Sequence, residues 1–231
     1  MADSLKLRCA VCDIPKERRA CRSPEGIGPA GCPTLEGQDT VEKVKEIYKD
    51  PVLAELARQA SIQEADNYVD MDTAPRSINT RIEEICQFAR KMGFRKLGIA
   101  YCSGLIEEAR ILHEILATQG FEVYSVICKA GCVPKEYIGL KDEEKIHPGQ
   151  YESMCNPVGQ AEFLNEAGTD LNILMGLCVG HDSLFIKQSQ AYTTIFAVKD
   201  RVMGHNPMAA LYLSSHYYKR LKMPGGTNLR K

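Results

Sequence analysis

The sequence contains no apolar segment long enough to cross a membrane, and its first six residues carry no hydrophobic signal-peptide core. The formal net charge is −1, so no overall electrostatic field attracts nucleic acid or an anionic membrane surface. Basic residues interleaved with aromatic ones, which would indicate a nucleic-acid platform, are also missing. We therefore expect a cytoplasmic protein that binds neither nucleic acid nor membranes.

Several well-known catalytic motifs are absent as well. The chain has no Gly-x-Gly-x-x-Gly, no Walker loop, no His-Glu-x-x-His and no nucleophile elbow for a serine triad. The first arginine after Cys102 is Arg110, eight residues later, which is too far along the chain for both residues to bind one phosphate in a phosphatase loop. No standard motif therefore names a reaction.

Cysteine, in contrast, is abundant, with 10 residues in a chain of 231. The hydrophobic content of 44% and the charged content of 26% are ordinary for a globular protein, and the chain is long enough to bury a core. In the reducing cytosol, many cysteines favour metal binding or redox chemistry over a disulfide framework. Thiolates are good ligands for zinc, copper(I) and iron–sulfur clusters, so metal binding is the first hypothesis.

The first four cysteines lie in an irregular, Pro- and Gly-rich arm, residues 1–38, which cannot bury a core of its own. They are Cys9, Cys12, Cys21 and Cys32. The Cys-x2-Cys pair is a good chelating hairpin, although the later spacings are long for a zinc ribbon. Cys32-Pro33 is typical of ferredoxin-type cluster sequences. The four thiolates suit a zinc ion or a 4Fe–4S cluster equally well, and the alternative is incidental thiols in a loose arm.

The rest of the chain shows helical and then alternating patterns. Residues 39–93 form a helical segment, with helices predicted over 39–60, broken at Asp50-Pro51, and over 75–92, ending at Gly93. Residues 94–222 alternate strands with helices, which predicts a Rossmann-like α/β domain with a doubly wound, mostly parallel sheet of four or more strands. The strands are predicted at 96–102, 121–127, 171–177 and 193–198, and the helices at 105–120, 157–167, 182–191 and 207–220. Residues 223–231 are expected to be a flexible tail.

A second set of cysteines follows the predicted strands. Open parallel sheets bind ligands outside the carboxyl ends of their strands, where the strand order reverses. Cys102, Cys128 and Cys178 end three strands, so they should share one rim, with Cys132 and Cys155 in the loop above it. These five are predicted metal ligands. The competing interpretation treats each one as a small buried hydrophobic residue, as we expect for Cys86 inside its helix.

Polar residues surround the same rim. His181 and His205 are candidates for metal ligation or proton transfer. Lys199 and Arg201 are candidates for holding an anionic substrate or balancing the charge of a thiolate-bound cluster. These four are the candidate catalytic residues.

Four short sequence motifs, together with the early cysteines, resemble those of a cysteine-rich bacterial and archaeal family of unknown function. The motifs are Gly98–Cys102, Cys128–Cys132, Cys155–Gln160 and Gly176–Asp182. Members of that family, many from anaerobes, are commonly described as candidate metal-binding proteins. The resemblance implies metal binding and, through the anaerobic context, an iron–sulfur cluster rather than zinc. It names no substrate and no reaction.

Three hypotheses follow. The first is a cytosolic iron–sulfur protein, with a 4Fe–4S cluster on the rim cysteines or shared with the arm, and with redox or group-transfer chemistry on a small anionic ligand. The second is a zinc-binding structural, sensor or metal-handling protein without catalysis. The third is a zinc-dependent hydrolase with cysteine and histidine ligands. The sequence leaves the oligomeric state and the physiological role open.

Overall fold

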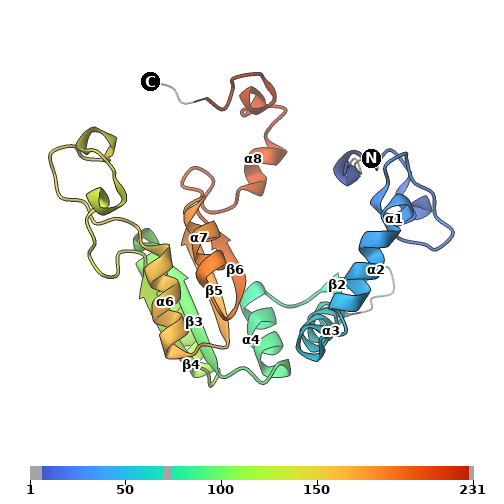
Figure 1. Ribbon diagram of the computed structural model, residues 1–231, viewed down its shortest axis with the longest axis horizontal. Helices are drawn as coiled ribbons and strands as arrows, with labels where there is room; N and C mark the ends of the chain where they lie inside the picture. Colours follow the sequence, from blue (N-terminus) through green and yellow to red (C-terminus); the bar gives the residue numbers. More distant parts are fainter. Residues whose placement is uncertain (1–6, 70–73, 229–231) are drawn as a thin grey trace. The chain divides into compact units, whose positions relative to one another are not determined.

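The computed structural model describes residues 7–69 and 74–228 (Figure 1). The chain divides into two compact units, residues 1–66 and 67–231, which we describe separately. The four-segment division expected from the sequence stays a prediction. Parts of its arm (residues 1–6) and tail (residues 229–231) lie outside the described residues.

The first unit consists of an irregular segment followed by helices. The helices are α1 (Pro33–Glu36), α2 (Gln38–Ile47) and α3 (Pro51–Asp66), preceded by the 3-10 turns η1 (Cys9–Val11) and η2 (Lys16–Arg18). The predicted break between α2 and α3 is confirmed. Asp50 accepts a hydrogen bond from the Leu53 backbone N–H at 2.8 Å, and Pro51 takes the first helical position, where its missing N–H costs nothing.

The second unit is built on a four-stranded, all-parallel sheet. Its strands are β3 (Lys96–Tyr101), β4 (Glu122–Ile127), β5 (Leu171–Leu177) and β6 (Tyr192–Val198), in the order β4-β3-β5-β6. The predicted α/β class is confirmed, and β5 has the predicted bounds. A separate antiparallel pair joins β1 (Tyr68–Val69) to β2 (Arg76–Ser77).

Helices cover both faces of this sheet (Figure 1). They are α4 (Arg81–Lys91) and α5 (Ile106–Thr118) on one face, and α6 (Pro157–Ala167) and α7 (His181–Gln188) on the other. The chain steps from β3 to β4 in one direction and then from β4 to β5 and β6 in the other. Right-handed crossovers therefore place the connecting helices on opposite faces. The strand order reverses between β3 and β5.

The core lies in two layers, one on each face of the sheet. Leu97, Ile99 and Ile173 point to the α4 and α5 side, and Ala100 and Leu174 to the α6 and α7 side. Cys86 is 3% exposed within the first layer, which confirms it as a core thiol. Short 3-10 turns complete the unit: η3 (Ser103–Leu105), η4 (Lys135–Ile138) and η5 (Asp142–Glu144).

The helix predicted to start near Pro75 begins at Arg81, so its first residues were wrongly assigned. Thr80 is the N-cap, because its side chain accepts from the Glu83 N–H while the Glu83 carboxylate accepts from the Thr80 N–H. Residues 76–77 form β2, which pairs with β1, so they are not part of the helix. Ile78, which the predicted helix placed on its apolar face, is 53% exposed.

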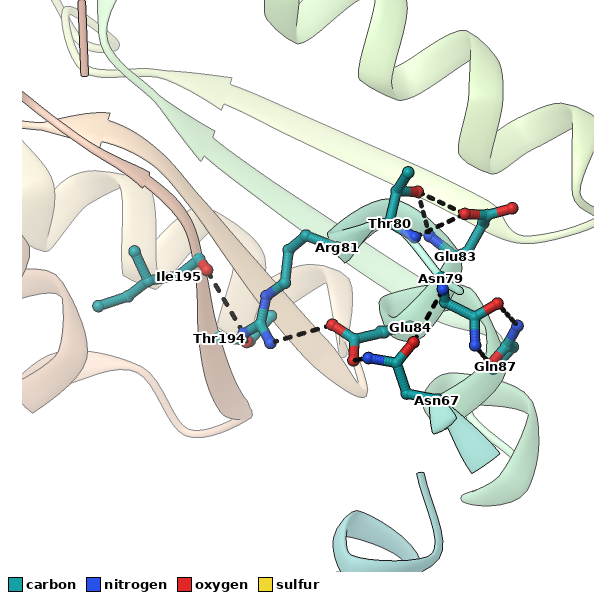
Figure 2. A network of polar contacts seen from close by, with 9 residues as sticks. All are labelled: Asn67, Asn79, Thr80, Arg81, Glu83, Glu84, Gln87, Thr194 and Ile195. Carbon is teal, nitrogen blue, oxygen red and sulfur yellow. Dashed lines mark hydrogen bonds and ion pairs between the residues drawn. The ribbon is translucent and has the colours of Figure 1, made fainter. Parts of the chain in front are cut away.

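The start of α4 is tied to the edge strand β6 by polar contacts (Figure 2). Arg81 donates to the Thr194 hydroxyl at 2.7 Å, and its other nitrogen lies 4.0 Å from Glu84. Glu84 in turn accepts from the Asn67 amide at 2.8 Å, and Asn67 accepts from the Asn79 backbone. The first turn of α4 is therefore fixed both by its cap and by a neighbouring strand.

Replacing Thr80 with alanine should lower the free energy of unfolding by about 1 kcal/mol, because one N–H at the start of α4 loses its acceptor. Thr80→Ser keeps the hydroxyl and is the matched control. Urea unfolding followed by circular dichroism measures both variants. Equal losses for the serine and alanine variants would show that the cap is not what fixes this helix.

The predicted helix over 207–220 is also wrong in length. It is reduced to α8 (Met208–Tyr212), followed by turns and the 3-10 turn η6 (Lys219–Lys222). None of the residues of α8 or η6 is fully buried, so little apolar burial is available to stabilise a longer helix. Across the described ranges, no helix is long and apolar enough to span a membrane.

Candidate metal centre

The carboxyl ends of the strands bring the predicted rim residues to one edge of the sheet. Tyr101 at the end of β3 is in register with Ile127 of β4 and Met175 of β5. Cys102, Cys128 and Cys178 directly follow β3, β4 and β5, and Lys199 follows β6. The edge between β3 and β5 is also where the strand order reverses, which is the usual ligand site of such sheets.

Cys155 returns to this edge although it lies far from β4 in sequence. The Asn156 N–H donates to the Cys128 carbonyl at 2.7 Å, which folds the end of the long loop back onto the end of β4. The Asn156 side chain then caps α6 by accepting from the Gly159 N–H at 2.9 Å. The thiols of Cys128 and Cys155 are hydrogen-bonded to each other, and the Ser103 N–H donates to the Cys128 sulfur at 3.3 Å.

This thiol pair is polarised. The pKa of Cys155 is lowered to about 6, first by the hydrogen bond from Cys128 and then by the nearby Lys129 ammonium, against the opposing effects of burial and Cys178. The pKa of Cys128 is raised, because it keeps the shared proton and is buried. Cys155 therefore carries the negative charge of the pair at neutral pH.

In metal-free protein, Cys155 should be the first thiol alkylated by iodoacetamide at about pH 7, because the thiolate is the nucleophile. Its alkylation rate should rise through a midpoint near pH 6, the pKa of this thiol. Peptide mass mapping identifies the modified residue, and Cys155→Ser should remove the fast phase. A rate that rises only around the ordinary thiol pKa would contradict the polarised pair.

Arg201 connects three of the rim thiols electrostatically. Its guanidinium donates to the Cys178 sulfur at 3.4 Å. The pKa of Arg201 is raised by that hydrogen bond and by the charge of Cys178, with smaller contributions from Cys102 and Cys155. Arg201 therefore contacts the Cys178 sulfur directly, at the edge of the sheet where the register of β3 and β5 also places Cys102.

Two further predicted residues lie at or near this edge, His181 and Lys199. His181, half-buried at the start of α7, has a lowered pKa because of burial and the charge of Lys129, so it is neutral. The Lys199 ammonium lies over the ends of β3 and β5, since a β-carbon built on Gly104 or Gly176 would be 3.8 or 3.6 Å from it.

His205 differs from the other predicted polar residues. Its Nδ1 atom lies 3.2 Å from both the Asp200 backbone nitrogen and the Val198 carbonyl, and its φ is +64°. His205 thus folds back on its own loop and holds the loop that carries Lys199 and Arg201.

Gln160 of α6 is a site residue that the motif analysis did not single out. It is completely buried, and its amide donates to the Tyr101 and Val126 carbonyls at 3.1 and 2.7 Å, joining the ends of β3 and β4. Within the described part of the chain, its Oε1 atom has no hydrogen-bond partner. The available signal was a polar side chain on the same buried helix face as Ala161 and Leu164.

Cys132, the fifth predicted rim cysteine, makes different contacts. It is exposed, has a φ of +49°, and its sulfur lies 3.4 Å from the Tyr151 hydroxyl within the same loop. The sulfurs at the strand edge are those of Cys102, Cys128, Cys155 and Cys178. Among residues 7–69 and 74–228, no three cysteine, histidine or acidic side chains already lie close enough to hold a single metal ion.

The arm cysteines gather in the first unit. Cys9, Cys12, Cys21 and Cys32 all line one pocket of about 400 Å³. Which of the predicted cysteines bind metal stays a prediction at both places.

The comparisons with known proteins place the chain in a family. Residues 32–196 match the family described as "Protein of unknown function (DUF1847)", so the chain belongs to that family. An uncharacterized protein of Methanocaldococcus jannaschii is 47% identical over 184 residues, covering 80% of this chain and 89% of that protein. No solved structure matches. The matched range includes all four strand-edge cysteines and, of the four arm cysteines, Cys32 alone.

The strand-edge donors fit an iron–sulfur cluster chemically. Four thiols are available, and a cubane cluster takes one thiolate at each of four irons. Its ligands therefore stand farther apart than the sulfurs around one zinc ion, which are about 3.8 Å from one another at a Zn–S distance of about 2.3 Å. Two cationic side chains act on these sulfurs, Lys129 on Cys155 and Arg201 on Cys178, and they offset part of the negative charge of a cluster.

Proposed function

We propose that this chain is a cytosolic iron–sulfur protein that holds a 4Fe–4S cluster on the four strand-edge cysteines. They are Cys102, Cys128, Cys155 and Cys178. The observation that carries the proposal is the convergence of sulfurs from four separate segments at the point where the strand order reverses.

The charge around these sulfurs supports the proposal. Thiolate ligands give a cluster net negative charge, which is costly to hold beside a buried sheet edge unless cations compensate it. Lys129 lowers the pKa of Cys155, and Arg201 donates to Cys178. Each cation sits in the residues directly after a strand, so the fold supplies the counter-charge with the ligands.

A bound cluster supplies one-electron redox chemistry. Lys199 and Arg201 would bind the negatively charged group of a small-molecule ligand at the strand edge. His181, being neutral, would accept or donate a proton there. Gln160 would keep the ends of β3 and β4, and with them Cys102 and Cys128, at a fixed separation.

Zinc binding is the competing function, either in a structural or sensor protein or in a hydrolase. One observation favours it: the thiols of Cys128 and Cys155 interact directly, so two candidate ligands already lie next to each other. For a hydrolase, His181 would be the nitrogen ligand, leaving a position for water.

Anaerobic purification separates these functions. The proposal expects a brown protein with iron and acid-labile sulfide in equal amounts, and a cluster signal in electron paramagnetic resonance after reduction. Iron, sulfide and zinc are quantified per chain on the same sample. A colourless protein that contains zinc but no iron or sulfide would refute the cluster.

A further inference from the structure

The described part of the arm, residues 7–38, has a defined backbone without a hydrophobic core. In the described part of the first unit, Gln63 of α3 is the one residue with a buried side chain, and the arm itself has none. Val11 and Ile27 are 67% and 44% exposed. Apolar burial therefore cannot repay the conformational entropy of ordering this segment.

The arm is nevertheless organised around its cysteines. Cys9 and Cys12 flank one 3-10 turn, in which the Cys12 N–H donates to the Cys9 carbonyl at 3.3 Å, so both thiols leave from the same turn. Arg19 donates to the Ile14 and Cys12 carbonyls at 2.7 and 3.0 Å and ties that turn to the next one.

The two remaining cysteines are brought to the same pocket by a backbone pairing. Ile27 pairs with residues 18–20 across the turn that follows Cys21: the Ala20 N–H donates to the Ile27 carbonyl at 2.9 Å, and the Ile27 N–H donates to the Arg18 carbonyl at 2.8 Å. Gly28 then packs against Cys32, since a β-carbon at Gly28 would lie 2.7 Å from the Cys32 sulfur. The pocket of about 400 Å³ is lined by all four cysteines and by Arg8 and Arg19.

We propose that the arm is a second metal site, a four-cysteine structural zinc site whose occupancy folds the arm. It is separate from the proposed cluster, because all its ligands lie in residues 9–32 of the first unit. Structural zinc sites are closed by four protein ligands, and they replace a core in short loop-rich segments by coupling metal binding to folding. In the described structure the four sulfurs line the pocket but are not yet close enough to share one ion. Zinc binding would draw them into a tetrahedron.

The charge and exposure of the site suit this ion. Four thiolates around Zn²⁺ leave a net charge of about −2, which Arg8 and Arg19, both lining the pocket, reduce against the opposing charge of Asp13. Cys9 and Cys21 are exposed, so water reaches the site. Zinc has no redox chemistry and tolerates that exposure in a purely structural role.

The test uses the full-length protein and counts metals per chain. Wild type is expected to hold one zinc in addition to any iron. Cys21→Ser should lose that zinc and keep the iron, Cys178→Ser should keep the zinc, and Cys132→Ser, an exposed cysteine outside both sites, should keep both metals. The proposal is overturned if Cys21→Ser retains the zinc. It is also overturned if the Cys178→Ser variant holds iron on the arm cysteines.

Folding of the arm is measured by limited trypsin digestion. Lys16, Arg18, Arg19 and Arg22 are potential cleavage sites within the arm. Digestion there should be at least tenfold faster after zinc is removed with a chelator, and re-added zinc should restore protection. Equal rates with and without zinc overturn the coupling of binding to folding.

A second variant tests the site without removing a sulfur. Gly28→Ala forces the Cys32 sulfur to move, so zinc affinity measured by competition with a chromogenic chelator should fall at least tenfold. Cobalt(II) substituted for zinc should give the intense visible bands of a tetrahedral thiolate site in wild type, and weaker bands in this variant. A wild-type cobalt spectrum without those bands would show that the four sulfurs do not share one ion.

Discussion

Cys128→Ser should lose almost all of the iron and the visible absorption that we expect for anaerobically purified protein. Cys128 is 2% exposed, accepts from the Ser103 N–H and is hydrogen-bonded to Cys155, so its sulfur is buried and held in place at the strand edge. A serine hydroxyl is a hard, weakly acidic oxygen and replaces a thiolate poorly as an iron ligand. Iron and sulfide analysis with absorption spectroscopy measures the loss.

Cys132→Ser is the matched control for this loss. Cys132 is only four residues further along the chain, but it is exposed and contacts Tyr151 instead of another cysteine. Its serine variant should keep the wild-type iron content. If Cys128→Ser retains its iron while Cys132→Ser loses it, the ligand set assigned to the strand edge is wrong.

Gly98→Ala should destabilise the second unit by about 3 kcal/mol. A β-carbon at Gly98 would lie 2.1 Å from the Asn172 side-chain oxygen and 2.9 Å from Leu164, all within the sheet and its covering helix. Asn172 is completely buried and is hydrogen-bonded to Thr169 and Ser189 at 2.9 Å each. The added methyl group must displace the buried Asn172 amide and break its hydrogen bonds to Thr169 and Ser189, which no water replaces in the core.

The measurement is urea unfolding followed by circular dichroism, with Gly104→Ala as the control. A β-carbon at Gly104 meets nothing closer than the Lys199 ammonium at 3.8 Å, so this variant should stay within about 0.5 kcal/mol of wild type. Equal stability of the two alanine variants would show that β3 and β5 separate to make room. Loss of metal is not expected from Gly98→Ala at low denaturant, because Gly98 lies four residues before Cys102.

The local elements of the second unit were largely readable from the sequence. Apolar runs such as Leu171–Leu177 are typical of strands buried on both faces, and the helix predicted over 157–167 is α6 with those bounds. The wrongly predicted helix boundaries lie where contacts between distant residues override the local sequence preference. Pro75 looked like a helix start, yet Thr80 caps α4 because the preceding residues pair as a strand. Residues 213–218 form turns instead of a helix, and none of them is fully buried.

For the candidate sites, the sequence by itself determined that cysteines follow three parallel strands and crowd the arm. Parallel topology then requires Cys102, Cys128 and Cys178 to share an edge. Only the tertiary structure decided that Cys155 joins them while Cys132 does not, because the hydrogen bond from Asn156 to the Cys128 carbonyl returns the loop end to β4. It also decided that Gln160 joins β3 to β4. The return of a long loop depends on contacts between residues distant in sequence, and no local pattern encodes them.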